Sequence, residues 1–438
     1  MSAADSPKED PVSFHRQLRP ILQQKCQGCH QPAKLRGGLL LTSFDGAAKG
    51  GDGGKLWVAG KPADSLLVHS LKGVNGQKLM PEGEPALPAE QIGLFEKWIA
   101  QGAKDDTPEQ FKRTLVTQEA PTYTAPVTIT AMAHSPDGTA LAVAGYREVL
   151  LHKPDGSELL GRLVGLSERI ESVVFSPDGN ILLVAGGSAG RFGELQFWDW
   201  RKQKLLFSVM PSFDTVYGAS FSNDGKLVAF GCADNSLRII EADKGKQVRK
   251  LDHHLDWVFG TAFTLNGKSI ISASRDRTVK LCEVDTGALI GNVTTLDPTQ
   301  PSSGMRQLIR RPTADQCLAG GEDGIPRLYG GEVKGGAGGN LIRTYGKLPG
   351  KVESAAFSAD GKMLAAGGVG GTVMVYGTDD ARQVAKLSVP CTTFALSFQR
   401  DGKALAVAGH DGKVRLFNLA DGKPLAEFVP VPLTPAKN

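Results

Sequence analysis

The sequence predicts a multidomain chain: a small all-α domain, followed by a large all-β body built from a repeated unit. The chain has 438 residues, which is more than one ordinary hydrophobic core usually serves. Glycine accounts for 54 of them, about 12% where roughly 7% is usual, and this content is typical of a body dense in turns. After about residue 127 a turn motif recurs at near-regular intervals, which predicts a repeat architecture.

Charge and hydropathy exclude several classes of protein. Lys and Arg number 50 against 46 Asp and Glu, a net charge of +4 without a basic tract, so we predict no nucleic-acid partner. No apolar run approaches the roughly 18 residues of a membrane helix, so we predict no transmembrane segment. The first residues, MSAADSPKEDPVS, lack the apolar stretch of a secretory signal.

The composition changes near residue 105, from helical patterns to a polar stretch dotted with proline and then to the repeats. We expect the helical domain and the repeat body to fold separately. The predicted segments are a disordered N-terminus (1–11), the helical domain (12–104), a linker (105–126), the repeat body (127–431) and a C-terminal tail (432–438).

The first helical pattern leads into the motif CQGCH at residues 26–30. Phe14, Leu18, Ile21 and Leu22 fall on one helical face. Pro20 lies within this pattern. Because proline lacks a backbone N–H, it must either kink this helix or start its second half.

A second helix is predicted over Pro88–Gln101. Proline occupies its first turn and Gly102 follows its end, which are typical start and stop residues. Ile92, Phe95 and Ile99 share one face. That face is expected to belong to the core of the small domain.

Within CQGCH, Cys26 and Cys29 are three residues apart, so on a helical turn they point to the same side. There each can form a thioether with a haem vinyl group while His30 reaches the iron, and CxxCH is the attachment pattern of c-type haem. A zinc site needs two more ligands, and no other Cys or Cys/His pair lies nearby. A redox pair needs a thioredoxin-like setting that the flanking residues lack. The pattern favours haem and leaves the other two readings open.

The stretch from Val12 to Ala103 resembles the planctomycete-type cytochrome c domain, a class I cytochrome c fold whose haem-bearing N-terminal helix packs across a C-terminal helix. The resemblance covers nearly the whole domain, although Glu82 stands where a second proline often follows Met-Pro. In that family such domains are often joined to propellers. The matching pieces are Val12-Ser13-Phe14, Arg19-Pro20-Ile21-Leu22, Cys26 to His30, Gly37-Gly38-Leu39, Gly60-Lys61-Pro62 to Leu67, Met80-Pro81 and Trp98 to Ala103.

The resemblance implies one covalently bound haem c. Cys26 and Cys29 then carry the thioethers, His30 is the proximal iron ligand and Met80 the distal one. Methionine is usually a core residue. Here it stands in a Met-Pro turn between polar residues, which disfavours a core role. His69, in the apolar segment LLVHSL, is the alternative distal ligand.

The repeat is marked by a turn of the type SPDG, which occurs in full at residues 135–138 and 176–179 and in looser copies later. Each copy continues as apolar runs that alternate with tight turns, which predicts antiparallel hairpins. The interval of 94 residues before the fifth turn hides an eroded copy, which we place at TADQ, around Asp315. The turn residues are Asp137, Asp178, Asp224, Asn266, Asp360 and Asp401, spaced by 41, 46, 42, 94 and 41 residues.

A unit of about 41–49 residues with four short strands resembles a WD40-type propeller blade. Seven such units fit between residues 127 and 431, and packing seven sheets radially buries faces that a single sheet cannot bury. The one WD pair, Trp198-Asp199, is placed at the end of a third strand. The residues expected between blades are Phe175, Phe221, Phe263, Phe357 and Phe398, with His134 in the same place in the first blade.

No constellation of convergent polar groups is evident in the predicted propeller. Its four cysteines fall in or beside strand patterns of different blades and are expected to be small buried hydrophobes, not disulfides. Its other histidines are expected to be scattered surface residues. These residues are Cys232, Cys282, Cys317 and Cys391, and His152, His253, His254 and His410.

The sequence favours an electron carrier over a catalyst: a low-spin haem protein whose propeller docks an unidentified redox partner. Covalent haem attachment takes place outside the bacterial cytoplasm, so we expect a periplasmic or otherwise exported protein and take the given chain as a mature form. Two alternatives remain open. One is a redox enzyme whose propeller binds a second cofactor or substrate, and the other is a haem-containing scaffold or sensor.

Overall fold

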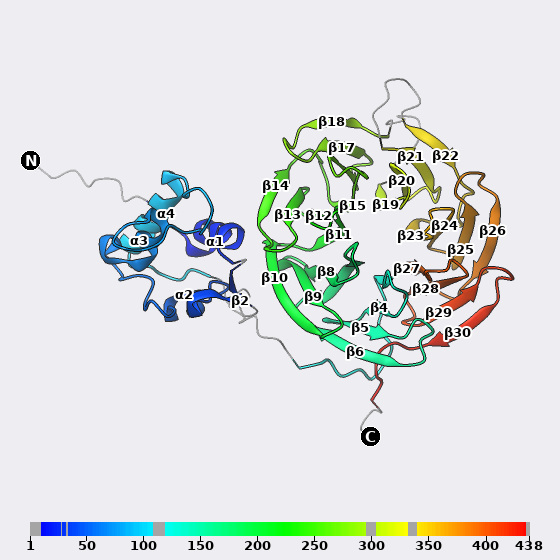
Figure 1. Cartoon of the computed structure of the whole chain (residues 1–438), viewed down its shortest axis with the longest axis horizontal. Coiled ribbons are helices and arrows are strands. Elements are labelled where there is room, and N and C mark those ends of the chain that lie inside the picture. Colours follow the sequence, from blue (N-terminus) through cyan, green and yellow to red (C-terminus); the bar gives the residue numbers. More distant parts are fainter. Residues whose placement is uncertain are drawn as a thin grey trace, which may run out of the picture. The chain divides into compact units, whose positions relative to one another are not determined.

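The computed structural model describes residues 10–27, 29–31, 34–107, 119–294, 304–331 and 340–434, and it divides the chain into two compact units, 1–116 and 117–438. The first unit is helical and the second is a seven-bladed propeller, which confirms the predicted fold classes (Figure 1). Residues 1–9 of the predicted N-terminus, 108–118 of the predicted linker and 435–438 of the predicted tail lie outside the described residues.

Short helices joined by loops build the first unit. No helix in the described ranges combines the length and the apolar character that crossing a membrane requires. The elements are η1 (Phe14–Leu18), α1 (Arg19–Lys25), β1 (His30–Gln31), β2 (Lys34–Leu35), η2 (Arg36–Gly38), α2 (Phe44–Lys49), η3 (Pro62–Asp64), α3 (Leu66–Lys72) and α4 (Ala89–Ala100).

The N-terminal helical segment changes type at its proline. Ser13 caps η1, because its Oγ accepts a hydrogen bond of 2.9 Å from the N–H of Arg16. η1 is a π-helix, and Pro20 lies in the first turn of α1, where its missing N–H costs little. The proline therefore starts the second half of the segment, one of the two predicted outcomes.

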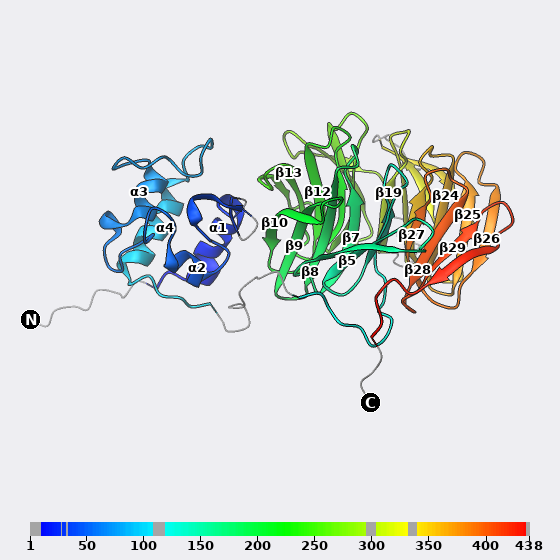
Figure 2. The same cartoon turned by 60° about the horizontal axis from the view of Figure 1, so that its bottom comes forward.

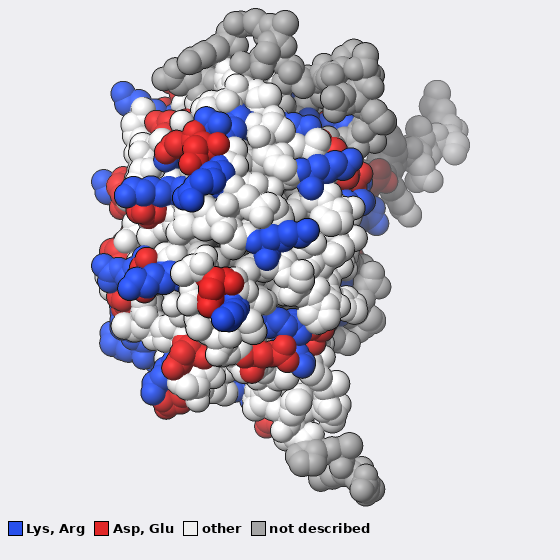
Figure 3. Space-filling model, turned by 90° about the vertical axis from the view of Figure 1, so that its right-hand side faces the viewer, with Lys and Arg blue, Asp and Glu red and all other residues white. Residues whose placement is uncertain are grey.

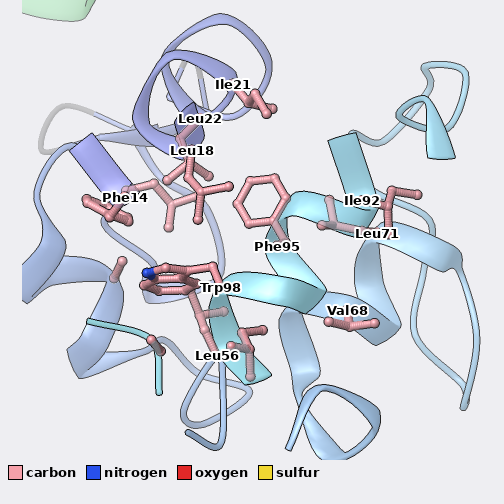
Figure 4. Packing of buried hydrophobic residues seen from close by; sticks show 14 of the residues in the cluster. Phe14, Leu18, Ile21, Leu22, Leu56, Val68, Leu71, Ile92, Phe95 and Trp98 are labelled. Carbon is pink, nitrogen blue, oxygen red and sulfur yellow. The ribbon is translucent and has the colours of Figure 1, made fainter. Parts of the chain in front are cut away.

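The core of the first unit lies where η1 packs on α4 (Figure 4). Leu18 and Ile99 are fully buried there, and the rings of Phe14 and Trp98 lie 5.5 Å apart. The indole Nε1 of Trp98 also donates to the carbonyl of Lys104 at 2.9 Å. α4 matches the predicted second helix, with Pro88 as its N-cap and Gln101 as its C-cap.

The described part of the second unit forms seven four-stranded antiparallel sheets, each made of four consecutive strands. The strands are β3 (Met132–His134), β4 (Leu141–Ala144), β5 (Glu148–His152), β6 (Leu159–Val164); β7 (Arg169–Phe175), β8 (Ile181–Ser188), β9 (Phe192–Asp199), β10 (Lys204–Ser212); β11 (Val216–Phe221), β12 (Leu227–Cys232), β13 (Leu237–Glu241), β14 (Gln247–Leu251); β15 (Val258–Phe263), β16 (Ser269–Ser274), β17 (Val279–Glu283), β18 (Leu289–Asn292); β19 (Met305–Arg310), β20 (Gln316–Gly321), β21 (Arg327–Gly330), β22 (Leu341–Thr344); β23 (Val352–Phe357), β24 (Met363–Gly368), β25 (Thr372–Gly377), β26 (Gln383–Ser388); β27 (Thr393–Phe398), β28 (Ala404–Gly409), β29 (Val414–Asn418) and β30 (Pro424–Phe428).

The seven sheets close into a ring (Figures 1 and 2). The first strand of each blade contacts the first strands of both neighbouring blades, and β27 contacts β3 to complete the ring. The two ends of the unit also meet, because Tyr123 and Leu433 form a parallel bridge and the N–H of Ile129 donates to the carbonyl of Gly409. Each inner strand is still an edge strand of its own sheet, but closing the ring leaves these edges short and surrounded by the neighbouring blades.

The repeated turn has one geometry. In the second blade Ser176 Oγ donates to Asp178 Oδ1 at 2.5 Å, and the same oxygen accepts from the N–H of Asn180 at 3.1 Å. Gly179 has a φ of +71°, which a side chain would oppose. The carboxylate thus satisfies the backbone of the turn. The same hydrogen bond to the N–H two residues ahead recurs at Asp137, Asp224, Asn266, Asp360 and Asp401.

The eroded turn of the fifth blade lies two residues earlier than predicted. β19 ends at Arg310 and β20 begins at Gln316, and Ala314 donates its N–H to the carbonyl of Arg311. The turn is therefore RPTA, and Asp315 follows it. Thr313 takes the place of the aspartate, which explains why the sequence pattern is hard to recognise.

The residues expected between blades are found there. Phe175 packs in a cluster with residues of the first two blades, Phe263 with the third and fourth, and Phe398 with the sixth and seventh. His134 contacts the seventh blade through Ser397 Oγ at 2.9 Å, and burial lowers the pKa of its imidazole to about 4. Cys232, Cys282 and Cys317 are buried free thiols, as predicted, whereas Cys391 is half-buried beside Asp411.

On its outer side the propeller carries interleaved charges. Figure 3 shows acidic and basic side chains mixed across the face seen in that view. Neighbouring pairs such as Lys413–Glu427, at 2.5 Å, account for part of this mixture. Exposed pairs of this kind each stabilise a fold by about 0–1 kcal/mol.

Candidate functional site

The motif CQGCH forms a tight turn at the end of α1. The N–H of Cys26 still donates to the carbonyl of Leu22 at 2.9 Å, as in a helix. The N–H groups of Cys29 and His30 then both donate to the carbonyl of Cys26 at 3.2 Å. The turn therefore holds the backbones of both cysteines and the histidine within one helical turn, which is the arrangement that the spacing predicts.

Both cysteines are free thiols, and their surroundings keep Cys26 protonated. Cys26 packs against the hydrophobic core of the unit, and burial, with Cys29 adding to it, raises the pKa of its thiol to about 12. A redox CxxC pair works through a thiolate of lowered pKa. In the described residues, moreover, no three His, Cys, Asp or Glu side chains gather as a metal site would need. The raised pKa of Cys26 disfavours the redox reading.

The imidazole of His30 is oriented by the chain that follows it. Its Nδ1 lies 3.0 Å from the carbonyl of Arg36 and donates to it, which leaves the lone pair of the neutral ring on Nε2. Burial lowers the pKa of this imidazole, and hydrogen bonds to backbone carbonyls counteract part of the shift. A neutral imidazole with a free lone pair on Nε2 is the form that binds iron.

The segment that carries Met80 is attached at two points. The N–H of Met80 donates to the carbonyl of Ser70 at 2.8 Å, near the end of α3. Two residues on, Glu82 pairs with Arg36 at 3.6 Å. Since Arg36 also supplies the carbonyl that accepts from His30, this residue connects the Met80 segment with the loop that orients the histidine. Sequence reasoning missed both Arg36 and Glu82, because neither belongs to a ligand motif.

His69 lies on α3 and its Nε2 is already engaged. This atom lies 2.7 Å from the carbonyl of Ala63 and 3.0 Å from Nδ2 of Asn75. Met80 is half-buried. That it is the distal ligand, with His69 as the alternative, stays a prediction.

Two propeller histidines are not the surface residues that the sequence suggested. His254 is buried; its Nδ1 lies 2.9 Å from Asp276 Oδ2 and its Nε2 lies 2.8 Å from Ser272 Oγ. His152 is also buried, with Nε2 at 3.0 Å from the carbonyl of Pro430. The imidazole rings of His254 and His152 are therefore buried and hydrogen-bonded. His253 is half-buried, and His410 is exposed.

Comparison with known families agrees with this geometry. Residues 26–83 match the family described as Planctomycete cytochrome C, a range that holds the CQGCH turn and Met80 but omits η1 and α4. Residues 204–241, 245–283, 339–377 and 384–418 match the WD domain, G-beta repeat. No curated protein matches the chain. Both resemblances stated from the sequence are thereby confirmed: the chain joins a region similar to planctomycete cytochrome c to a WD40 propeller.

Proposed function

We propose that this protein is an electron carrier that works outside the bacterial cytoplasm and holds one haem c. Cys26 and Cys29 bind the haem through thioethers, and His30 and Met80 are its iron ligands. The match to a cytochrome c family supports haem binding, since that is the property its members share. The CQGCH turn supports covalent attachment.

The observation that carries this proposal is the pairing of the His30 Nδ1 with the carbonyl of Arg36. Metal-binding histidines typically donate their second ring N–H in this way, because the hydrogen bond fixes the tautomer and the ring plane. In the neutral ring this hydrogen bond places the proton on Nδ1 and the lone pair on Nε2. Together with two free thiols and a half-buried thioether, the donor set fits a c-type haem.

Such a haem supplies one-electron chemistry between ferric and ferrous iron. The residues of the chain would set the reduction potential of the haem and provide its apolar surroundings. The thioether of Met80 is a weak donor that favours ferrous iron, so a His/Met pair gives a higher potential than two histidines. The packing of Cys26 against the core places the attachment side next to apolar side chains. Both effects suit an electron carrier with a fixed ligand set.

The propeller serves in this proposal as the surface that docks the redox partner. Loops on a rigid scaffold are where recognition usually occurs, and seven blades present many of them. Export follows from the haem, because its covalent attachment takes place outside the bacterial cytoplasm.

A truncated protein tests whether the helical unit carries the electron while the propeller binds the partner. Residues 1–104 with haem should keep the reduction potential of the full chain but lose selective binding to the redox partner.

The distal ligand is tested by absorbance of the oxidised protein. We expect the weak near-infrared band of sulfur-to-iron charge transfer, and Met80→Ala should remove it and open the iron to added imidazole or cyanide. His69→Ala is the matched variant from the same segment and should leave the band unchanged. A band that survives in Met80→Ala, or that disappears in His69→Ala, would show that the ligand is assigned wrongly.

A further inference from the structure

An open cavity of about 480 Å³ lies in the propeller where the inner strands begin. Sites for small molecules usually measure about 300–1,000 Å³, so the volume suits such a ligand. Every blade contributes to the wall. Lining residues from successive blades are about forty positions apart in the chain, so no local sequence motif marks this cavity.

Equivalent positions of the blades supply the side chains that form the wall. The pairing of the first two strands shifts register at this position in five blades, namely at Glu171, Phe259, Arg306, Glu353 and Phe394. A bulge of this kind redirects a side chain out of the regular pleat. Tyr217 and Thr130 complete the set in the other two blades, and all seven residues line the cavity. We call these seven residues the channel ring.

Aromatic faces dominate one side of the cavity. The rings of Tyr217 and Trp257 lie 6.0 Å apart and are inclined by only 21°, and Phe259 stands across Tyr217 at 5.1 Å. All three rings are half-buried, and guanidinium groups lie over two of them: Arg275 over Trp257 at 4.4 Å and Arg306 over Phe259 at 5.4 Å from the ring centroids. Burial raises the pKa of Tyr217 to about 12, and its hydroxyl therefore remains a hydrogen-bond donor.

The charged side chains that line the cavity form ion pairs, two within the lining and one with Asp256, which lies outside it. Arg169 lies 2.6 Å from Glu171, Arg275 lies 2.8 Å from Asp256, and Arg306 lies 4.0 Å from Glu353. An anion or a cation entering the cavity would have to break such a pair. A neutral ligand avoids that cost and meets guanidinium donors beside carboxylate acceptors.

We propose that the channel ring binds a neutral saccharide. A sugar hydroxyl is donor and acceptor at once, so it can accept from an arginine and donate to the glutamate paired with it. The C–H face of a pyranose ring is apolar and packs on aromatic rings such as Trp257 and Tyr217. Neither ion pairing alone nor aromatic stacking alone fits this wall as well, because charged and aromatic side chains both line it.

The test is a glycan array probed with the full-length haem protein, followed by calorimetric titration of the best-bound oligosaccharide. The array holds neutral, uronic-acid and amino-sugar oligosaccharides of two to four units. We expect retention of neutral glycans and at least about tenfold weaker binding of both charged classes. Trp257→Ala and the double variant Arg306→Gln/Glu353→Gln should each weaken binding about tenfold or more.

The matched control is Leu255→Ala, which removes an 86% exposed side chain from the same loop as Trp257 but outside the cavity. It should bind the glycan as the unaltered protein does, and thermal unfolding checks that every variant is folded. The proposal is overturned if the folded protein binds no glycan on the array, if it prefers a charged class, or if Trp257→Ala binds as tightly as Leu255→Ala.

Discussion

The residues of the two proposed sites come from different kinds of places along the chain. In the helical unit three of the proposed haem-binding residues, Cys26, Cys29 and His30, fall within five residues of the chain, on one short turn beside the core. In the propeller the side chains that converge come from equivalent positions of seven separate repeats. A local motif is therefore readable from sequence alone, whereas a site assembled by symmetry becomes visible only when the repeats are closed into a ring.

The units also stabilise themselves differently. The helical unit depends on one small cluster of apolar side chains, in which Trp98 contacts three other aromatic rings. The propeller adds buried polar networks to its apolar layers, such as the one that joins His254 to Asp276. This difference makes the following variants specific to one unit.

The largest effect is expected for Trp98→Ala. It removes a large, 2% exposed side chain and its hydrogen bond to Lys104, which should lower the free energy of unfolding of the helical unit by about 3–5 kcal/mol. Scanning calorimetry should show two transitions, of which only the one from the helical unit shifts. Val74→Ala, at a 42% exposed position, is the control. A common shift of both transitions would contradict the separation of the units.

A smaller effect is expected for Asp276→Asn in the propeller. The amide has only one acceptor oxygen, so it cannot accept both from His254 and Leu255, which contact Oδ2, and from Thr278, which contacts Oδ1; the propeller should lose about 1–3 kcal/mol. Asp421→Asn changes an exposed turn and should cost at most about 0.5 kcal/mol. Equal losses in the two variants would mean that the buried network contributes no stability of its own.

The same residue gives the propeller a pH dependence. Burial raises the pKa of Asp276, but hydrogen bonds from His254, Thr278 and Leu255 outweigh burial and hold it well below its usual value. The unfolded chain therefore takes up a proton before the folded one does, and this stability is present above about pH 4 and is lost as the pH falls further. Between pH 5 and 3 the propeller transition should fall more steeply in the unaltered protein than in Asp276→Asn.

The smallest effect is expected for Glu82→Gln. Arg36 and Glu82 are 60% and 53% exposed, so their pairing should contribute less than about 1 kcal/mol to the helical unit. The variant should lower the first calorimetric transition slightly at low ionic strength and not at all in about 1 M salt, where such pairs are screened. A loss that persists in high salt would point to a packing role for Glu82.

Residues close in sequence were predicted well. The helix now seen as α4 followed from apolar spacing with its proline and glycine, and the blades followed from repeated turns, because both patterns are set by neighbours along the chain. Longer-range features were missed. The buried place of His254 depends on Ser272 and Asp276 of the following hairpin, and the role of Arg36 depends on its backbone carbonyl, which no side-chain pattern records.

The central claim is that Cys26 and Cys29 hold one haem covalently. It is tested most directly by intact mass spectrometry of the full chain, exported in a host that carries the cytochrome maturation machinery. The account predicts a denatured polypeptide heavier by one haem, unchanged after acid-acetone extraction, whereas the double variant Cys26→Ala/Cys29→Ala should have the mass of the polypeptide alone. A haem that washes out of the unaltered protein, or zinc recovered in its place, would contradict it.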